Sequence, residues 1–315
     1  MKISGFSFVR NGIKLYYPVK ESIMSILPIC DEFIVAVGKG DDDDNTREII
    51  ESIGSDKIKI IDTEWDQQHW KKGAINSIQT NIALKECTGD WCFYVQADEV
   101  VHEKYLDIIK SRCEKFLNDE RVEGLLFDYK HFWGDYDHYH KSHGWYPYEI
   151  RIVRNKSNIY SWESAQSFRV YDEYKDTHQK EGTRKLRVAY ANADIYHYGW
   201  VRPPHLMRNK SKALDSVHKG KDATEERYKK LSEEFDYGPL NKLALFKGTH
   251  PEVMKEMISK MNWKEKLQYS GSPSELRELH KHERFKYRFV SSIENTFFGG
   301  KQIGGFKNYE LVTRD

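Results

Sequence analysis

Two adjacent carboxylates end an apolar segment in the sequence FYVQADEVV. Asp98 and Glu99 follow Gln96, directly after the apolar residues 93–95. A carboxylate at the carboxyl end of a buried strand faces a crevice, where it can bind Mg²⁺ or Mn²⁺ together with phosphate oxygens of a ligand. Acidic residues also suit the first turn of a helix, so the pair could simply begin the next helix. This segment alone leaves both interpretations open.

A second acidic segment, KGDDDD, follows another apolar run. Its aspartates at 41–43 are placed to accept hydrogen bonds from a ribose or a base, although a charge run is commonly a solvated loop. Like charges at the end of a strand are unfavourable unless a cation or hydrogen-bond donors offset them. Arg10, just past the first apolar segment, is placed to contact a diphosphate or a base, or to form a surface ion pair.

Histidines form the third candidate group. His197 lies among aromatic residues in DIYHYGW, and its neutral imidazole could complete a coordination shell begun by Asp98. The alternative is a core histidine with satisfied hydrogen bonds. His138 and His140 alternate, but no cysteine or close carboxylate set accompanies them at zinc-site spacing. We therefore interpret residues 131–149 as an aromatic loop that recognises an acceptor.

The elements that must position these residues alternate between strand and helix over the first 118 residues. The apolar runs predict strands, and the helical periodicity and capping signals predict helices between them. The strands are predicted at 3–9, 32–38, 57–62 and 91–96, and the helices at 18–27, 45–54, 75–87 and 103–117. This rhythm is typical of a parallel α/β sheet with right-handed crossovers. Ligands of such sheets bind at the carboxyl ends of the strands, so the loops with Arg10, the aspartates and Asp98 open on one edge.

The pattern changes after about residue 122. Further strands, expected to extend the sheet with antiparallel additions, are predicted at 123–134, 146–155, 167–171 and 187–200. Helices are predicted at 203–218, 224–235, 251–263 and 274–297. We expect a domain at 1–204, with a nucleotide-binding half at 1–121 and an acceptor half at 122–204. A helical extension at 205–315 would pack on it.

The bulk composition excludes several classes of protein. The 50 basic and 49 acidic residues nearly cancel, so no overall field attracts nucleic acid or an anionic membrane. No apolar run approaches the ~18 residues of a transmembrane helix, and the N-terminus lacks the features of a signal peptide. The four cysteines show no CxxC spacing, which indicates reduced core thiols. We expect a cytoplasmic protein without an integral membrane segment.

Taken together, the segments SGFSFVRNG, DEFIVAVGKGDDDDNT, GDWCFYVQADEV and IYHYGW resemble the family 2 glycosyltransferases. The resemblance covers about residues 1–205. It implies the GT-A fold, a mostly parallel sheet flanked by helices, here with antiparallel additions and a C-terminal helical extension. It also implies inverting transfer of a sugar from a nucleotide-diphosphate donor, a UDP- or GDP-sugar, to an acceptor hydroxyl in glycan or cell-surface polysaccharide synthesis.

The resemblance assigns roles to individual residues. The family's metal-binding DXD motif falls on Gln96, Ala97 and Asp98, with glutamine in place of the first aspartate. Asp98 and His197 would then hold Mg²⁺ or Mn²⁺ against the donor diphosphate. The predicted nucleotide-sugar site comprises Arg10, Lys39, Asp41, Asp42, Asp43, Gln79, Gln96, Ala97 and Asp98.

In-line transfer also needs a carboxylate that takes the proton of the acceptor hydroxyl. Glu163 is the first candidate for this catalytic base, because it lies in an aromatic, irregular segment of the acceptor half. Glu149 and Asp128 are the next candidates.

Two other classes of function remain open. The chain could be a nucleotide-sugar binding protein without turnover, and Gln96 in the metal motif is the feature that suggests it. It could also be a metal-dependent phosphohydrolase that uses the same acidic edge. The phosphohydrolase is disfavoured because the sequence lacks a second carboxylate and histidine set for a two-metal site.

Overall fold

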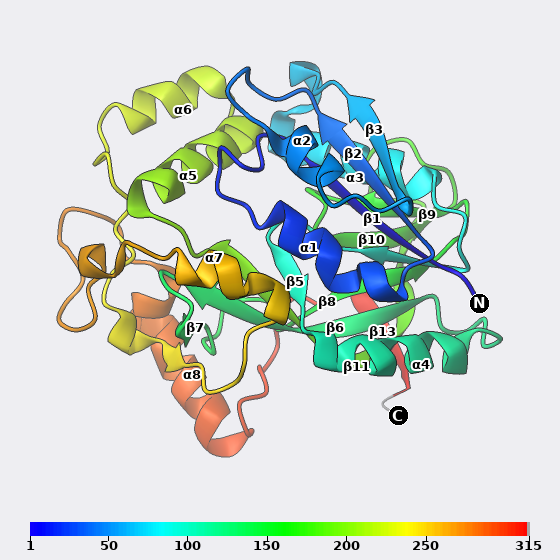
Figure 1. Cartoon of the computed structure of the whole chain (residues 1–315). Coiled ribbons are helices and arrows are strands. Elements are labelled where there is room, and N and C mark those ends of the chain that lie inside the picture. The colour runs from blue at the N-terminus through cyan, green and yellow to red at the C-terminus, as the bar shows by residue number, and fades with distance from the viewer. Residues whose placement is uncertain (314–315) are drawn as a thin grey trace.

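A parallel half-sheet forms the N-terminal part of the chain, as the sequence predicts (Figure 1). The computed structural model describes residues 1–313. Four strands run parallel in the order β3-β2-β1-β4. Their bounds are β1 (Ile3–Val9), β2 (Glu32–Gly38), β3 (Ile58–Thr63) and β4 (Trp91–Tyr94). The connecting helices are α1 (Val19–Ile26), α2 (Thr46–Glu51) and α3 (Ala74–Lys85).

The strand order contains a topological switch point. From β1 the chain moves outward through β2 to β3, and then returns to place β4 on the other side of β1. The loops after β1 and β4 therefore diverge at one edge of the sheet, where a crevice opens. Arg10 follows β1 and Gln96 lies just past β4, so both lie at this crevice.

The second half of the sheet contains the predicted antiparallel additions. β4 pairs antiparallel with β8, which pairs antiparallel with β6. The long strand β11 then runs parallel to β6, and β10 and β9 continue antiparallel. The bounds are β6 (Gly124–Trp133), β8 (Tyr148–Arg154), β9 (Ile159–Trp162), β10 (Ser167–Tyr171) and β11 (Thr183–Trp200).

A short strand that the sequence did not predict brings two parts of the candidate site together. The predicted strand 91–96 ends at Tyr94, and after a turn the chain forms β5 (Glu99–Val101). β5 pairs antiparallel with the end of β11, with His197 opposite Glu99. The backbone N–H of Tyr198 also donates to the carbonyl of Asp98 at 2.8 Å. This register brings the loop after β4 beside the end of β11.

Helices cover both faces of the sheet. On one face, Ile23 and Ile26 of α1 pack in a cluster with Ile109 and Phe116 of α4 (Leu106–Phe116). On the other face, α3 packs against the sheet beside β9 and β10. Both faces of β1, β2 and β4 are thus buried, which explains the continuously apolar sequences of β2 and β4, whereas the edge strand β3 stays partly exposed.

The C-terminal segment contains helices, as predicted, but also long irregular stretches and strands. Its helices are α5 (Pro204–Lys219), α6 (Lys221–Tyr228), α7 (Lys255–Ser259) and α8 (Phe285–Phe297). The predicted helices at 224–235, 251–263 and 274–297 are therefore too long. Two strands were missed: β12 (Ala244–Leu245) pairs with β7 (His138–Tyr139), and β13 (Tyr309–Thr313) runs parallel beside β11. The division at residue 204 remains a prediction.

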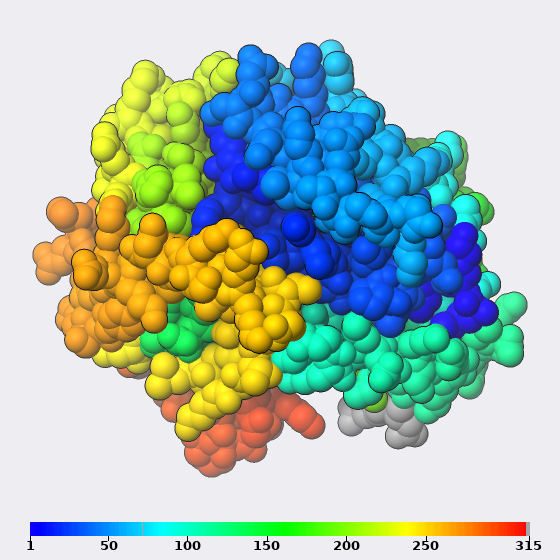
Figure 2. All heavy atoms as spheres, in the orientation of Figure 1, coloured from blue at the N-terminus to red at the C-terminus, as the bar shows by residue number. Residues whose placement is uncertain are grey.

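The segment packs closely on the N-terminal half. In Figure 2 the yellow-green and orange segments lie directly against the blue ones.

Two further observations concern the environment of the chain. Over residues 1–313, no helix has the length and apolar character that crossing a membrane requires. All four cysteines are buried and free, which confirms the predicted core thiols.

Candidate active site

A cleft of about 1620 Å³ opens at the switch point, between the carboxyl edge of the sheet and the helices α5 and α6. It brings together residues predicted from separate parts of the sequence. The predicted residues that line it are Arg10, Asp41, Gln96, Ala97, Asp98 and His197. The convergence that the sequence predicts for the loops after β1, β2 and β4 is therefore present.

The two adjacent carboxylates have different surroundings. Glu99 is fully buried and forms a bidentate ion pair with the buried Arg151, with both N–O distances at 2.8 Å. It also accepts a hydrogen bond from the Tyr129 hydroxyl at 2.8 Å. Asp98 is 7% exposed and faces the cleft. Glu99 therefore stabilises the turn from inside, and Asp98 is the carboxylate available to a ligand.

A chain of hydrogen bonds fixes the imidazole of His197. Nε2 of His131 lies 2.8 Å from the carbonyl oxygen of Tyr146, so this nitrogen carries the proton. Nδ1 of neutral His131 is then an acceptor, and it lies 3.0 Å from Nδ1 of His197. Burial, and to a smaller extent the neighbouring His197, holds the pKa of His131 well below its usual value. His131 is therefore neutral. Nδ1 of His197 consequently donates to His131, and Nε2 of His197 lies 3.7 Å from Oδ2 of Asp98.

Lys210 of α5 completes the group. Its ammonium lies 3.0 Å from Oδ2 of Asp98 and 2.6 Å from the carbonyl oxygen of Gly199. Burial, followed by the Arg202 guanidinium, lowers the pKa of Lys210 to about 8, while Asp98 acts in the opposite direction. Burial opposes ionisation of Asp98, yet Lys210 holds the pKa of this carboxyl well below its usual value. The pair is therefore ionised near neutral pH.

Gly199 allows these side chains to meet. A Cβ atom at this position would lie 2.5 Å from Nε2 of His197 and 2.6 Å from Oδ2 of Asp98. Both distances are far shorter than ordinary van der Waals contact, so any side chain here would force the pair apart. The glycine leaves a small gap between the imidazole and the carboxylate.

The predicted metal site requires a test against this geometry. Asp98 and His197 alone are spaced to share a cation, but Lys210 already neutralises the carboxylate from 3.0 Å. A divalent ion about 4 Å from an ammonium is repelled by about 8 kcal/mol at an effective dielectric constant of about 20. In the described part of the chain, no three His, Cys, Asp or Glu side chains are grouped to hold a metal ion. The site as arranged does not fit Mg²⁺ or Mn²⁺.

Arg10 and Asp41, two of the residues predicted to bind the nucleotide, line the cleft where the loops after β1 and β2 meet it. Nε of Arg10 donates to the carbonyl of Lys39 at 2.8 Å, and the guanidinium lies 3.5 Å from Asp41. Lys14 pairs with Asp41 at 2.8 Å and with Asp43 at 2.6 Å. These lysine and arginine side chains are the donors that offset the acidic run. Lys39 lines a smaller adjoining hollow with Arg10.

Besides Lys39, three more of the predicted nucleotide-site residues do not line the main cleft. Asp42 and Asp43 are exposed to solvent, and the Asp43 side chain is 71% exposed. Gln79 is buried in α3, where its amide oxygen accepts a hydrogen bond from Thr63 at 2.5 Å. Gln79 therefore joins α3 to β3 and contributes to the packing of the sheet.

The three candidates for the catalytic base differ in whether they line the cleft. Glu163 does not line the cleft, and its carboxylate lies 2.8 Å from Nδ1 of His178. Asp128 also lies outside the lining; burial, with Asp194 opposite it on β11, raises its pKa to about 6. Glu149 lines the cleft, and burial raises its pKa to about 7 although Arg151 counteracts the shift. The geometry thus favours Glu149 over Glu163.

An aromatic wall borders the same cleft. Trp133 stacks on Trp200 with ring centroids 4.8 Å apart, and Trp145 stacks on His140 at 4.1 Å. His138 and His140 do not form a zinc site: His138 contacts Asp135, and neither ring nitrogen of His140 has a partner among the described residues. The predicted segment 131–149 is not a single loop, because it includes the end of β6, β7 and the start of β8, but it reaches the cleft through Trp133, Trp145 and Tyr146.

Several site residues were missed by the sequence analysis. Lys210 lies in a lysine-rich helix, and the available signal was its place between Met207 and Val217 on the buried face of α5. Trp65 follows β3, lines the cleft and lies 5.8 Å from the Arg10 guanidinium. Its position after a strand of the parallel sheet was the signal. No sequence pattern singled out His131.

The fold and cleft define an α/β protein whose ligand site lies at a switch point of the sheet. No family model matches the chain, and no curated protein matches it. Among solved structures the chain is similar to residues 1–349 of S. aureus TarS, also solved in complex with UDP. The identity is 16%, the coverage is 69% of this chain and 65% of that one, and the TM-score is 0.38.

It is also similar to glucosyl-3-phosphoglycerate synthase from Mycobacterium tuberculosis, solved with Mn²⁺, UDP and glucosyl-3-phosphoglycerate. The identity is 17%, the coverage is 42% of this chain and 45% of that chain, and the TM-score is 0.29. The match to the longer TarS structure spans 43% of that protein. These likenesses concern part of each fold and do not by themselves define an activity for this chain.

Proposed function

We propose that this protein is a glycosyltransferase that moves a sugar from a nucleoside-diphosphate donor to an acceptor hydroxyl. The observation that carries the proposal is the meeting of Asp98, His197 and Lys210 in one cleft at the switch point of the sheet. A carboxylate, a fixed imidazole and a buried ammonium form a polar centre that suits the diphosphate of a donor. The sequence resemblance to family 2 glycosyltransferases, drawn from residues 1–205, points to the same class.

The donor nucleotide would lie between Trp65 and Asp41. An indole face beside the Arg10 guanidinium offers a surface for a base to stack on, and Asp41 can accept hydrogen bonds from a ribose. From there the diphosphate would extend toward Lys210. UDP, which is bound in the TarS and synthase structures, is the first nucleotide to test, followed by GDP.

Glu149 would act as the base of the transfer step. The bond between the anomeric carbon and the diphosphate oxygen breaks, and its electron pair leaves with the nucleoside diphosphate. The acceptor oxygen forms the new bond, and its proton passes to the Glu149 carboxylate. A pKa of about 7 suits this role, because a base poised near the working pH transfers protons most effectively. A single displacement of this kind inverts the anomeric centre.

The acceptor would bind along the aromatic wall of Trp133, Trp145 and Trp200, whose rings can pack on the C–H faces of a sugar. His282 lines the same wall, is 1% exposed, and has no hydrogen-bond partner at either ring nitrogen among the described residues. Such a buried imidazole can bond to a hydroxyl of the acceptor. We also propose a cytoplasmic location, because all four thiols are free.

The test separates transfer from the two alternatives. Purified protein is incubated with UDP-glucose, UDP-N-acetylglucosamine and GDP-mannose, with and without a panel of oligosaccharide acceptors, and nucleotide, phosphate and glycan products are quantified. Transfer predicts nucleoside-diphosphate release that increases with one acceptor and a product of inverted configuration by NMR. Binding and a thermal shift without release would indicate a binding protein, and release of inorganic phosphate would indicate a phosphohydrolase.

Glu149→Gln provides the internal check on the chemistry. Loss of a general base lowers kcat about 10²–10⁴-fold, while the thermal shift by donor should persist. Glu163→Gln is the matched control, because that carboxylate contacts His178 outside the cleft lining. Equal losses in the two variants would contradict the assignment of Glu149.

A further inference from the structure

We infer that the ammonium of Lys210 supplies the positive charge that this site sets against the donor diphosphate, in place of a divalent cation. The inference rests on the proposed function, because it concerns how the same cleft holds a nucleotide-sugar donor. It assigns to a protein side chain the task that the sequence resemblance gives to Mg²⁺ or Mn²⁺.

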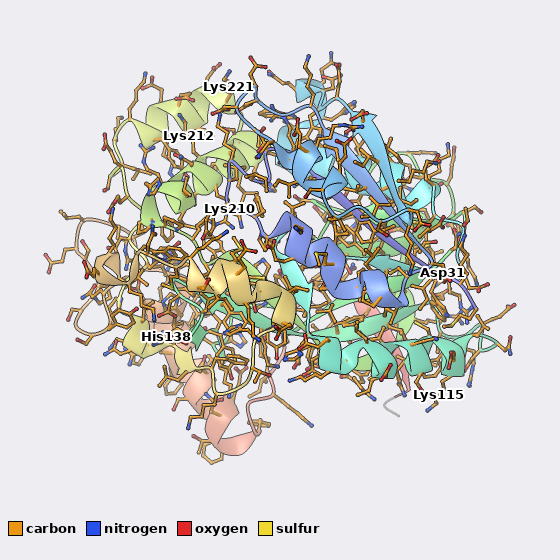
Figure 3. The ribbon with its side chains drawn as sticks, in the orientation of Figure 1. Asp31, Lys115, His138, Lys210, Lys212 and Lys221 are labelled. Atoms are coloured by element: carbon orange, nitrogen blue, oxygen red, sulfur yellow. The ribbon has the colours of Figure 1, made fainter. Side chains whose placement is uncertain are left out.

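The position of the ammonium is the first argument. Lys210 extends from α5 toward the N-terminal half, whereas Lys212, two residues on, lies on the side of α6 (Figure 3). An ammonium has three N–H donors. Asp98 and the carbonyl of Gly199 take two of them, and within residues 1–313 no hydrogen-bond partner takes the third. Since Lys210 lines the cleft, this donor is available to an oxygen of a ligand.

The immediate surroundings favour an ammonium. The hydrogen bond from Nδ1 of His197 to His131 directs Nε2 of His197 toward the carboxylate of Asp98, 3.7 Å away. A buried carboxylate in this position is stabilised by a positive donor beside it. Lys210 is such a donor, and it is held in place by the aromatic rings of Tyr17 and Trp200, 5.0 and 5.7 Å from its nitrogen.

The charge of the buried group is the second argument. Asp98 and Lys210 cancel each other, and the imidazole of His197 adds no negative charge. Arg202 is fully buried and donates to the carbonyl oxygens of Leu15 and Gly199, and none of the described carboxylates forms an ion pair with it. The group therefore has an excess of at least one positive charge before any ligand binds. An anion compensates this excess, whereas a divalent cation would increase it.

The transfer step remains balanced with lysine in this role. The leaving diphosphate takes the electron pair of the broken bond, and the Lys210 ammonium donates a hydrogen bond to it without giving up its proton. The acceptor proton goes to Glu149. No metal, oxidant or other co-reactant is required.

The experiment measures UDP binding by isothermal titration calorimetry in EDTA and in 5 mM Mg²⁺ or Mn²⁺. We expect the wild-type dissociation constants to agree within about twofold. Lys210→Met should weaken UDP binding about tenfold to a hundredfold, as expected for loss of a charged hydrogen bond. Lys212→Met is the matched control, because Lys212 pairs with Glu225 of α6 at 2.8 Å and should retain wild-type affinity.

The outcomes separate this inference from the proposed function. If wild-type protein binds UDP in Mg²⁺ or Mn²⁺ but not in EDTA, the proposed function stands and the role of Lys210 is overturned. If neither UDP nor GDP binds under any condition, the proposed function itself fails. Because Lys210→Met leaves Asp98 unpaired, the double variant Asp98→Asn/Lys210→Met removes both charges. It should fold and bind UDP as weakly as Lys210→Met, and wild-type affinity in it would overturn the inference.

Discussion

Nδ1 of His131 and Nδ1 of His197 lie 3.0 Å apart, in adjacent parallel strands that place the two histidines directly opposite each other. Because neutral His131 donates its single N–H, at Nε2, to the carbonyl oxygen of Tyr146, its Nδ1 accepts a hydrogen bond from Nδ1 of His197. The tautomer at the centre of the cleft is therefore fixed by a residue that does not line it.

We expect His131→Phe to lower nucleotide binding and transfer about tenfold to a hundredfold, the usual effect of losing a residue that orients a ligand-binding histidine. ¹⁵N NMR should show His197 as a mixture of tautomers in the variant and as one tautomer in the wild type. His138→Gln is the control, because His138 contacts Asp135 and lies away from Lys210 in Figure 3. An unchanged His197 spectrum in His131→Phe would refute the relay.

Glu149 predicts a specific pH dependence of activity. Its pKa is raised to about 7, mainly by burial, so the carboxylate needed as a base forms only as the pH rises through about 7. Activity should increase as the pH rises through about 7. The residual activity of Glu149→Gln should not show this increase. If wild-type activity instead rises with a midpoint near pH 4–5, Glu149 is not the titrating base.

The same raised pKa has an effect of opposite sign on stability. The folded protein binds the Glu149 proton more tightly than the unfolded chain, whose carboxyl titrates near 4.5. The stabilisation is complete below about pH 4.5 and is lost as the pH rises through about 7. As the pH rises from about 4.5 to about 7, deprotonation of Glu149 should lower the free energy of unfolding by about 1–3 kcal/mol. Urea denaturation at several pH values measures the slope, which Glu149→Gln should reduce.

Gly199→Ala should separate the carboxylate from the imidazole. Its Cβ would lie 2.5 Å from His197 and 2.6 Å from Asp98, so one of them must move. We expect a loss of stability of about 1–3 kcal/mol, as for other overpacked sites, and at least a tenfold loss of UDP affinity. Calorimetry and thermal unfolding measure the two effects. Wild-type affinity in Gly199→Ala would mean that the gap has no role in binding.

Replacing a carboxylate by the corresponding amide should have different effects at Glu99 and Asp98. Glu99→Gln leaves the buried Arg151 without its partner and should cost about 3–5 kcal/mol of stability. Asp98→Asn should cost less stability, because Lys210 borders the cleft where water can solvate it, and should weaken nucleotide binding, because the carboxylate no longer holds the ammonium in position. Chemical denaturation and UDP titration of both variants distinguish these roles. The assignment is wrong if Asp98→Asn is the more destabilising and Glu99→Gln the weaker binder.

The sequence determined the parallel half of the sheet and the edge at which the site lies. Continuous apolar runs and helical periodicity are local signals, and in a parallel sheet they place every strand's carboxyl end on one side. Arg10, Asp41 and Asp98 could therefore be assigned to one cleft from their positions after strands. The pairing of Asp98 with His197 was predicted through the family resemblance and agrees with the register of β5 and β11.

Only the tertiary structure decided which of several similar residues enter the cleft. Lys210 and Lys212 are alike in the sequence, but two residues rotate an α-helix by about 200°, from the buried face of α5 to the face toward α6. Glu149 and Glu163 likewise differ only in where their strands and loops direct them. Such choices depend on contacts between residues far apart in the chain, which local patterns do not encode. The charge of the centre therefore emerged only when α5 packed against the sheet.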